Sequence, residues 1–248
     1  MTGQSPWLHM ERGLYIAASG MVAEQARQDR VANDLANAST PGYKPSIAPQ
    51  ESFGAILLGR SIDGQPIGSL SAGVASATPV VDLSEGAVKE TDEPLDFAIE
   101  GDGFFSVRTP QGVQYTRNGQ LTLDATRRLV TATGEPVLDA QGGTITLPSG
   151  TPVVAADGAI GVAGKQIAKL ALTSVNVTSS LGGGLYAGTA RGPAAGTIRQ
   201  GALEGSGADP MTAMVDMMDS MRAYEAGQRV LHALDDSLGK AVSAGGLT

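Results

Sequence analysis

The chain of 248 residues has no cysteine, few aromatic residues (4%) and fewer basic than acidic residues. Without cysteine it can form no disulfide framework, no thiolate metal site and no thiol nucleophile. The formal net charge of -8 argues against nucleic-acid binding, which needs clustered Lys and Arg, and against adsorption to anionic membranes. With 34 glycines and few aromatics, the composition favours a core of small aliphatic side chains in Gly-punctuated β structure.

Long apolar runs are also missing. No stretch approaches the roughly 18–20 apolar residues that a membrane-spanning helix needs, so we expect no integral membrane protein. Residues 1–11 lack the basic start and apolar stretch of a Sec-type signal peptide, so we expect any export to use another route.

Candidate chemical groups are sparse. The only histidines are His9 and His232, and neither has a metal-binding partner at helical spacing other than ordinary acids. The acidic stretch around Asp96 has no spacing that specifies a pocket. Gly101-Asp102-Gly103 leads into a predicted strand rather than a helix N-terminus, so it is not a phosphate loop. The sequence therefore predicts no catalytic, cofactor or metal site, and no enzyme.

Both ends of the chain carry apolar residues at the spacing of one helix face. In the first segment these are Leu14, Ala17, Met21, Val31 and Leu35. In the last segment Met217, Tyr224, Leu231 and Leu238 repeat every seven, with Met214, Met221, Gln228 and Asp235 in the companion positions. A stripe of period 3.5 faces another helix, so we expect two terminal helices that pack together or on neighbouring molecules.

All eight methionines lie in these terminal segments. Methionine is flexible and can repack against more than one neighbour. Two interpretations stay open at this point, namely core filling within the helix pair and an assembly interface between subunits.

The expected fold class is α+β, with terminal helices forming a coiled-coil-like α domain, a central antiparallel β domain and extended connectors. The first helix should start at about Glu11 and should not extend past Thr40, because Pro41-Gly42 stops it, and the second should start with Asp209 as N-cap and Pro210. The expected divisions are 1–9, a disordered extension; 10–43, the first helix; 44–91, a connector with short strands; 92–197, the β domain with Gly-rich loops; and 198–248, a return segment and the second helix.

Short β-rich runs mark the expected strands. They lie at residues 53–58, 80–83, 95–99, 103–109, 113–117, 120–123, 128–131, 137–138, 144–147, 152–154 and 169–172. Asn118-Gly119 is the strongest hairpin signal, because both positions of a type I′ turn require positive φ. Residues 176–197 are expected to be a loop with a flexible point at Gly182-Gly183-Gly184. In the 103–109 run, Phe104 and Phe105 should point to opposite faces.

Separated segments together resemble the bacterial flagellar rod and hook proteins. Residues 13–21 and 31–44 resemble the N-terminal signature of that family, 95–105 and 115–119 its β domain, and 201–206 and 221–226 its C-terminal signature. The signature residues are Asn33, Leu35, Asn37, Thr40, Gly42, Gly103, Phe104, Tyr115, Thr116, Arg117, Gly119, Arg222, Tyr224 and Glu225. The chain departs from the family at Asp34 and Gly207, where Asn is common.

The resemblance implies a structural subunit of the flagellar basal-body rod. It implies copies of this chain in an open helical polymer joined by the terminal helices, partnership with other rod and axial subunits, export by the flagellar type III apparatus, and no cofactor. The chain length and single β domain favour a rod over a hook protein, and the motifs favour the proximal over the distal rod. Because both helix seams are narrow, we expect ends that order only on assembly.

Two alternatives come from other classes. A stand-alone binding module would present a pocket on the β segment, but no convergent polar or aromatic cluster marks one. A cell-wall hydrolase would need an acid pair on an added domain, and the chain has no spare length for it.

Overall fold

The computed structural model describes residues 6–48, 50–52, 56–59, 66–70, 74–76 and 78–245. The chain divides into two compact units. The first unit contains residues 1–33, 48–79 and 211–248, and the second contains residues 34–47 and 80–210. Both units therefore combine segments that are far apart in the sequence.

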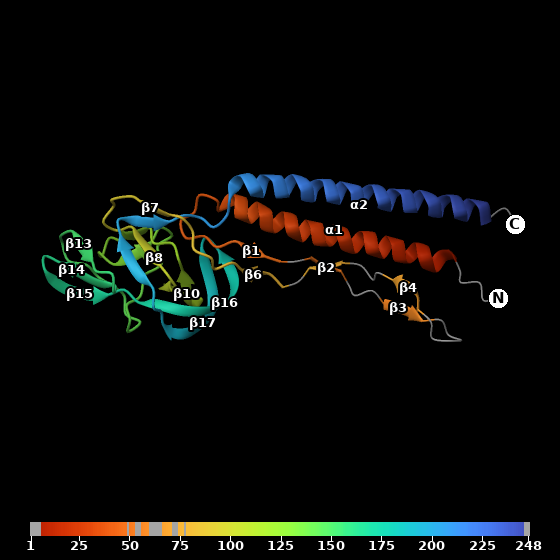
Figure 1. Cartoon of the computed structure of the whole chain (residues 1–248). Coiled ribbons are helices and arrows are strands. Elements are labelled where there is room, and N and C mark those ends of the chain that lie inside the picture. Colours follow the sequence, from red (N-terminus) through yellow and green to blue (C-terminus); the bar gives the residue numbers. More distant parts are fainter. Residues whose placement is uncertain are drawn as a thin grey trace. The chain divides into compact units, whose positions relative to one another are not determined.

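Two long helices dominate the first unit. Helices α1 (Pro6–Ala36) and α2 (Pro210–Gly245) run side by side, as Figure 1 shows. The predicted start of α2 at Pro210 is confirmed. No helix among the described residues has the length and apolar character needed to cross a membrane.

The predicted start of the first helix is wrong, because α1 begins before Glu11, whereas its end at Ala36 agrees with the prediction that the helix does not extend past Thr40. After Ala36 the chain tightens into turns, with Asn37 N donating to Asp34 O (3.2 Å) and Ala38 N to Leu35 O (3.3 Å). These bonds span three residues instead of four and end the α-helix ahead of Pro41.

The first unit also contains two short β-ribbons. Strand β2 (Gln50–Ser52) pairs with β5 (Val74–Ser76), and β3 (Ile56–Gly59) pairs with β4 (Pro66–Leu70). The predicted strand at 53–58 matches β3 over its last residues, and its first residues, 53–55, lie outside the described part.

In the second unit, strands near the start of the 80–210 segment pair with strands near its end or with residues 46–47. β7 (Val88–Glu90) pairs with β19 (Ala202–Glu204), and β8 (Phe97–Glu100) pairs with β18 (Thr197–Gln200). β1 (Ser46–Ile47) pairs with β6 (Val80–Val81).

A closed four-stranded barrel lies within this unit. Its order is β10 (Gly112–Thr116), β17 (Leu185–Pro193), β16 (Leu172–Gly182) and β9 (Phe104–Thr109). Beside it are a pair, β11 (Leu121–Leu123) with β12 (Leu129–Thr131), and a sheet of β13 (Pro152–Val154), β14 (Ala159–Val162) and β15 (Lys165–Lys169). The described strand pairs are antiparallel, so the predicted α+β class is confirmed.

The remaining predicted strands are only partly present as strands in the structure. Residues 137–138 and 144–147 form isolated bridges, such as Leu138 with Thr144, instead of strands. Residues 169–172 contain the end of β15 and the start of β16.

The predicted loop at 176–197 is wrong, because most of it forms the long hairpin of β16 and β17. Gly183 and Gly184 connect the strands with φ of 61° and 76°, the positive values that a two-residue type I′ turn needs. The glycine run is therefore a tight turn.

The predicted hairpin turn at Asn118-Gly119 is also wrong. β10 pairs with β9 and β17, whereas β11 pairs with β12, and neither Asn118 nor Gly119 has a positive φ. Glycine is needed here for close approach, since a Cβ at position 119 would lie 1.6 Å from the carbonyl oxygen of Phe97.

The second unit has two buried apolar clusters. The larger one contains Phe97, Phe105, Leu129 and Ile145 among its members, and the smaller one contains Phe104, Tyr115, Val175 and Tyr186. Phe104 and Phe105 thus point to opposite faces of β9, as the sequence predicted.

Candidate functional site

The seam between α1 and α2 follows a seven-residue repeat. Side chains of α2 that are buried or half-buried along this repeat are Ala213, Met217, Ser220, Tyr224, Gly227, Leu231, Leu234 and Leu238. Their alternating spacing of four and three is that of a helix packed on another helix. The predicted series from Met217 to Leu238 lies in this stripe, but its companion positions are one residue away from those read from the sequence.

Small residues occupy these companion positions and bring the helices close together. A Cβ at Gly227 would lie 2.7 Å from Met21 Cγ, and Ser220 Oγ donates a hydrogen bond to the backbone oxygen of Glu24 (3.1 Å). Arg27 Nη2 pairs with Asp216 Oδ1 at 2.8 Å. Because that pair is partly exposed, it is worth no more than about 1 kcal/mol.

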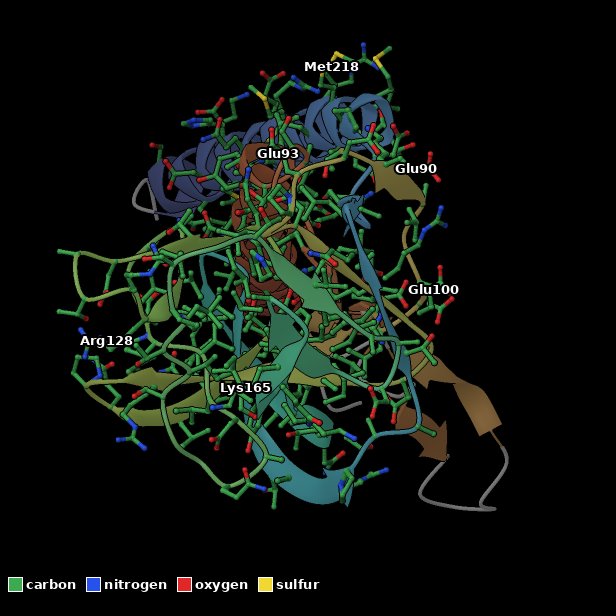
Figure 2. All side chains as sticks on the ribbon, turned by 90° about the vertical axis from the view of Figure 1, so that its left-hand side faces the viewer. Glu90, Glu93, Glu100, Arg128, Lys165 and Met218 are labelled. Atoms are coloured by element: carbon green, nitrogen blue, oxygen red, sulfur yellow. The ribbon has the colours of Figure 1, made fainter. Side chains whose placement is uncertain are left out.

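A second face of α2 is apolar and exposed. Met211 is 70% exposed, Met214 is 48%, and Met218 and Met221 are each 50%. Helical spacing of three and four places these residues on one face, which we call the methionine face. Figure 2 shows the Met218 side chain projecting outward from α2. Met214 and Met221, the companion positions of the sequence repeat, therefore lie outside the α1–α2 seam.

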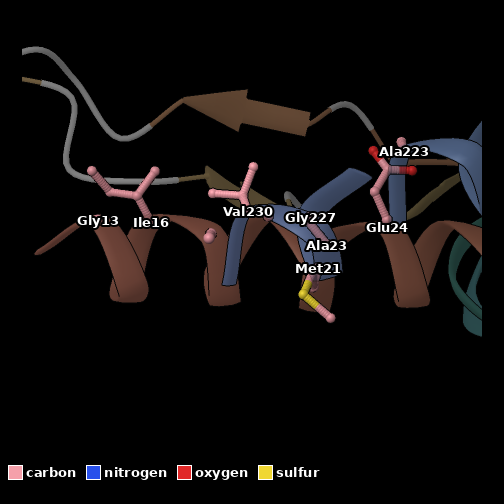
Figure 3. Close-up of a pocket in the computed structure, with 10 residues that line it drawn as sticks. Gly13, Ile16, Met21, Ala23, Glu24, Ala223, Gly227 and Val230 are labelled. Carbon is pink, nitrogen blue, oxygen red and sulfur yellow. The ribbon is translucent and has the colours of Figure 1, made fainter. Parts of the chain in front are cut away.

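The opposite flank of the helix pair is hollowed. An open groove of about 390 Å³ lies between α1 and α2, and Figure 3 shows its lining. Ile16 and Val230 point to the same side of the pair in Figure 3. Gly20, Ala223 and Gly227 also line the groove. Ala223 and Val230 lie between about a third and a half of a turn around α2 from Met214 and Met218. The helix pair thus has a ridge on one flank and a groove on the other.

The predicted positions on α1 contribute to these surfaces in different degrees. Val31 is buried, and Leu14, Ala17, Met21 and Leu35 are half-buried. Ala17 and Met21 line the groove, and Met21 contacts the Gly227 position.

The second unit contains a buried ion cluster. Lys44 Nζ lies 2.5 Å from Glu204 Oε1, and Arg117 Nη1 lies 3.3 Å from both carboxylate oxygens of Glu204. The Lys44, Glu204 and Arg117 side chains are 0%, 1% and 3% exposed. Gly86 N also donates to Glu204 Oε1 at 2.8 Å. Donors from three separate segments thus converge on the Glu204 carboxylate.

Arg117 uses its remaining donors on backbone carbonyls. Its Nε donates to Gly103 O (3.0 Å) and its Nη2 to Gly101 O (2.6 Å). The guanidinium carbon lies 5.4 Å from the centre of the Phe104 ring, which packs edge-on against Tyr186. These contacts lower the free-energy cost of burying the Arg117 guanidinium.

Two buried tyrosines tie Lys44 and its neighbours into the same region. Tyr186 OH accepts from Lys44 N (2.7 Å), and burial, together with the nearby Glu204 charge, raises the pKa of Tyr186 to about 12. Tyr43 OH donates to Asp34 Oδ1 (2.7 Å), and burial followed by this bond raises the pKa of Tyr43 above its ordinary value. Asp34, a departure from the family pattern, thus has a definite partner.

We call residues 37–45 the entry strap and residues 202–208 the return strap. Gly42 N donates to Glu204 O (2.8 Å), Gly207 N to Tyr43 O (2.9 Å), and Ser206 Oγ to Asn37 O (2.9 Å). Gly42 has φ of 65°, and a Cβ there would lie 2.3 Å from the Arg117 backbone. The two straps are therefore hydrogen-bonded to each other, and they supply Lys44 and Glu204 of the ion cluster.

The structure gathers part of the predicted signature at this cluster and leaves the rest elsewhere. Near the cluster or its straps are Asn37, Thr40, Gly42, Gly103, Phe104, Tyr115, Thr116, Arg117 and Gly119. Asn33 and Leu35 lie on α1, and Arg222, Tyr224 and Glu225 lie on α2. Lys44, Glu204 and Tyr186 were not singled out from the sequence; for Glu204 the available signal was a charged residue within the glycine-flanked apolar segment Gly201–Gly205.

The described residues hold no group of His, Asp and Glu that could bind a metal ion. The acidic stretch includes Asp96, which is buried, and its neighbours Glu93 and Glu100 are exposed on the surface shown in Figure 2.

Comparison with known proteins identifies the family. Family models described as "Flagella basal body rod protein", "Flagellar hook protein FlgE/F/G D1 domain" and "Flagellar basal body rod FlgEFG protein C-terminal" match residues 14–44, 98–167 and 199–244. Flagellar basal-body rod protein FlgF of Rhizobium meliloti (strain 1021) is 34% identical over 245 residues, which cover 94% of this chain and 97% of that protein. The chain belongs to the flagellar basal-body rod protein FlgF/FlgG family.

Other members of this rod protein family are similar over nearly their full lengths. FlgF of Salmonella typhimurium is 31% identical, covering 94% of this chain and 97% of that protein. FlgG of Bacillus subtilis (strain 168) is 30% identical, covering 94% and 99%. The family is structural and non-enzymatic, and the protein is a flagellar basal-body rod subunit.

Proposed function

We propose that this rod protein is a proximal-rod subunit that polymerises helically through its terminal helices. The observation that carries the proposal is the pair of unlike surfaces on opposite flanks of the helix pair, the methionine face and the groove. When unlike surfaces of identical subunits meet, each contact leaves a free surface at both ends, so the assembly stays open. Flexible methionine side chains suit a groove lined by Gly and Ala.

The predicted interface residues then have two roles. One group holds the helix pair together and contains Ala17, Val31, Met217, Tyr224, Leu231 and Leu238. The other group, Met214 and Met221, faces a neighbouring subunit. Because the seam also contains Ser220 and Gly227, it buries little apolar surface for its length. This supports the prediction that the helices become fully ordered only on assembly, which hydrogen exchange of a verified monomer would test.

The choice of the proximal rod rests on likeness alone. Two FlgF relatives are 34% and 31% identical to the chain, and a FlgG relative is 30% identical. We further propose export by the flagellar type III apparatus, contacts with other axial subunits, and one polymerising domain made from residues 10–43 and 198–248, with 92–197 as the outer β domain.

The assembly proposal is tested by placing a charge on the methionine face. Met218→Glu should leave the unfolding free energy of the monomer within about 0.5 kcal/mol, because the side chain is half exposed. In a strain lacking the gene, this variant should not restore swimming or full-length rods in purified basal bodies. Ala233→Glu, at an exposed position elsewhere on α2, and Met218→Leu should restore both. Normal rods built from Met218→Glu would contradict the proposal.

The rod segment is tested separately in the deletion strain. If the subunit is proximal, purified basal bodies without it should also lack the distal-rod subunit, since later segments have nothing to build on. Retention of the other proximal subunits together with loss of rod length would instead assign this chain to the distal rod.

A further inference from the structure

Glu204 is the only anion among the three charged side chains of the buried cluster. It accepts from Lys44, Arg117 and the backbone N of Gly86, and its own side chain is 1% exposed. Lys44 Nζ also donates to Ser84 O, and Arg117 donates to Gly101 O and Gly103 O. These carbonyls accept hydrogen bonds from the two cations, but they carry no opposite charge.

Two cations cannot be buried together without a compensating anion. A buried ion that loses its partner is strongly destabilised, because it gives up its hydration without gaining an ion pair. Lys44 and Arg117 would in addition repel each other across the site that Glu204 occupies. Burial of both side chains therefore depends on the carboxylate.

In the sequence, both cations precede the carboxylate on which their burial depends. Glu204 follows Lys44 by 160 positions and Arg117 by 87. A chain is made from its N-terminus, so both cations are present long before the carboxylate that neutralises them. Until the return strap arrives, Lys44 and Arg117 are better solvated by water than buried.

We propose that Glu204 closes a latch that orders the entry strap and the return strap together, once the return strap has been delivered. The backbone bonds from Gly42 N to Glu204 O and from Gly207 N to Tyr43 O then lock the straps to each other. Since the last turn of α1 is tied to the entry strap through Asp34 and Tyr43, the latch holds that turn only in a complete chain. This property goes beyond rod assembly and is independent of it.

The test is hydrogen exchange on the full chain carrying Glu204→Gln, which keeps the shape of the side chain and removes its charge. The amides of Gly42 and Lys44 in the entry strap should exchange at least roughly 100-fold faster, in step with those of Gly205 and Gly207 in the return strap. Amides of the barrel strands β9 and β10 should stay protected. If the return strap opens while the Lys44 amide, which donates to Tyr186 OH outside that strap, keeps its protection, Glu204 is only a local contact and the latch is refuted.

A second comparison decides the matter even if Glu204→Gln unfolds the whole unit. Lys44→Met leaves one cation facing one carboxylate, so it should be milder than Glu204→Gln. Adding Lys44→Met to Glu204→Gln removes one uncompensated cation and should recover the folding equilibrium constant by roughly tenfold or more. Additive losses would overturn the latch. Glu100→Gln, at an exposed carboxylate of the same unit, should change nothing.

Discussion

At Gly119 the sequence predicts a hairpin turn, whereas the structure shows a close approach to the backbone of Phe97. A Cβ at Gly119 would lie 1.6 Å from the Phe97 carbonyl oxygen and 2.7 Å from its carbonyl carbon. Since such contacts stay beyond 3.0 Å in real proteins, the β8 backbone would have to retreat by more than about an ångström. Phe97 is buried in the main core and its N donates to Gly119 O at 3.0 Å, so both packing and a hydrogen bond are disturbed.

Gly119→Ala should therefore lower the unfolding free energy by about 3 kcal/mol or more, adding overpacking to a weakened buried hydrogen bond. Urea denaturation followed by far-UV circular dichroism measures this loss. Gly134→Ala is the matched control: its φ is 96° but the space around it is open, so only about 1 kcal/mol of backbone strain is expected. If both substitutions cost the same, position 119 is an ordinary turn and the close-approach argument fails.

The remaining predictions concern the core, alkaline pH and the helix seam. Phe105→Ala should cost about 3–5 kcal/mol because Phe105 is fully buried, whereas Val113→Ala at a half-exposed position should cost far less; equal urea midpoints would contradict the core assignment. Because the pKa of Tyr186 is raised from 10.0 to about 12, the unfolded chain loses that proton first, so the stability contribution is complete below pH 10 and is lost as pH rises toward about 12. Urea midpoints of the parent and of Tyr186→Phe across this range test the point, and an equally steep decline in both would refute it. Gly227→Leu should force α2 away from Met21 and lower the helical melting temperature, and an unchanged melt would show that the seam can absorb a side chain there.

Local features were predictable from the sequence where neighbouring residues decide the outcome. Pro210 sets the start of α2 because its fixed φ suits a first helical turn. The repeat from Met217 to Leu238 marks the helix stripe, and the alternation of Phe104 and Phe105 marks the two faces of a strand. The signature segments indicated the family because each retains its local residue pattern.

Features that depend on distant partners were decided only by the tertiary structure. The seam uses Ser220 and Gly227 rather than Met221 and Gln228, since which side of a heptad stripe faces α1 depends on the approach of α1 itself. Asn118-Gly119 has the composition of a turn, yet it forms no type I′ turn, and the glycine is required by the close approach of the Phe97 carbonyl. Glu204 and Lys44 form one buried site across 160 positions, and no local propensity can specify such a pair, because the free energy that buries each charge comes from the other.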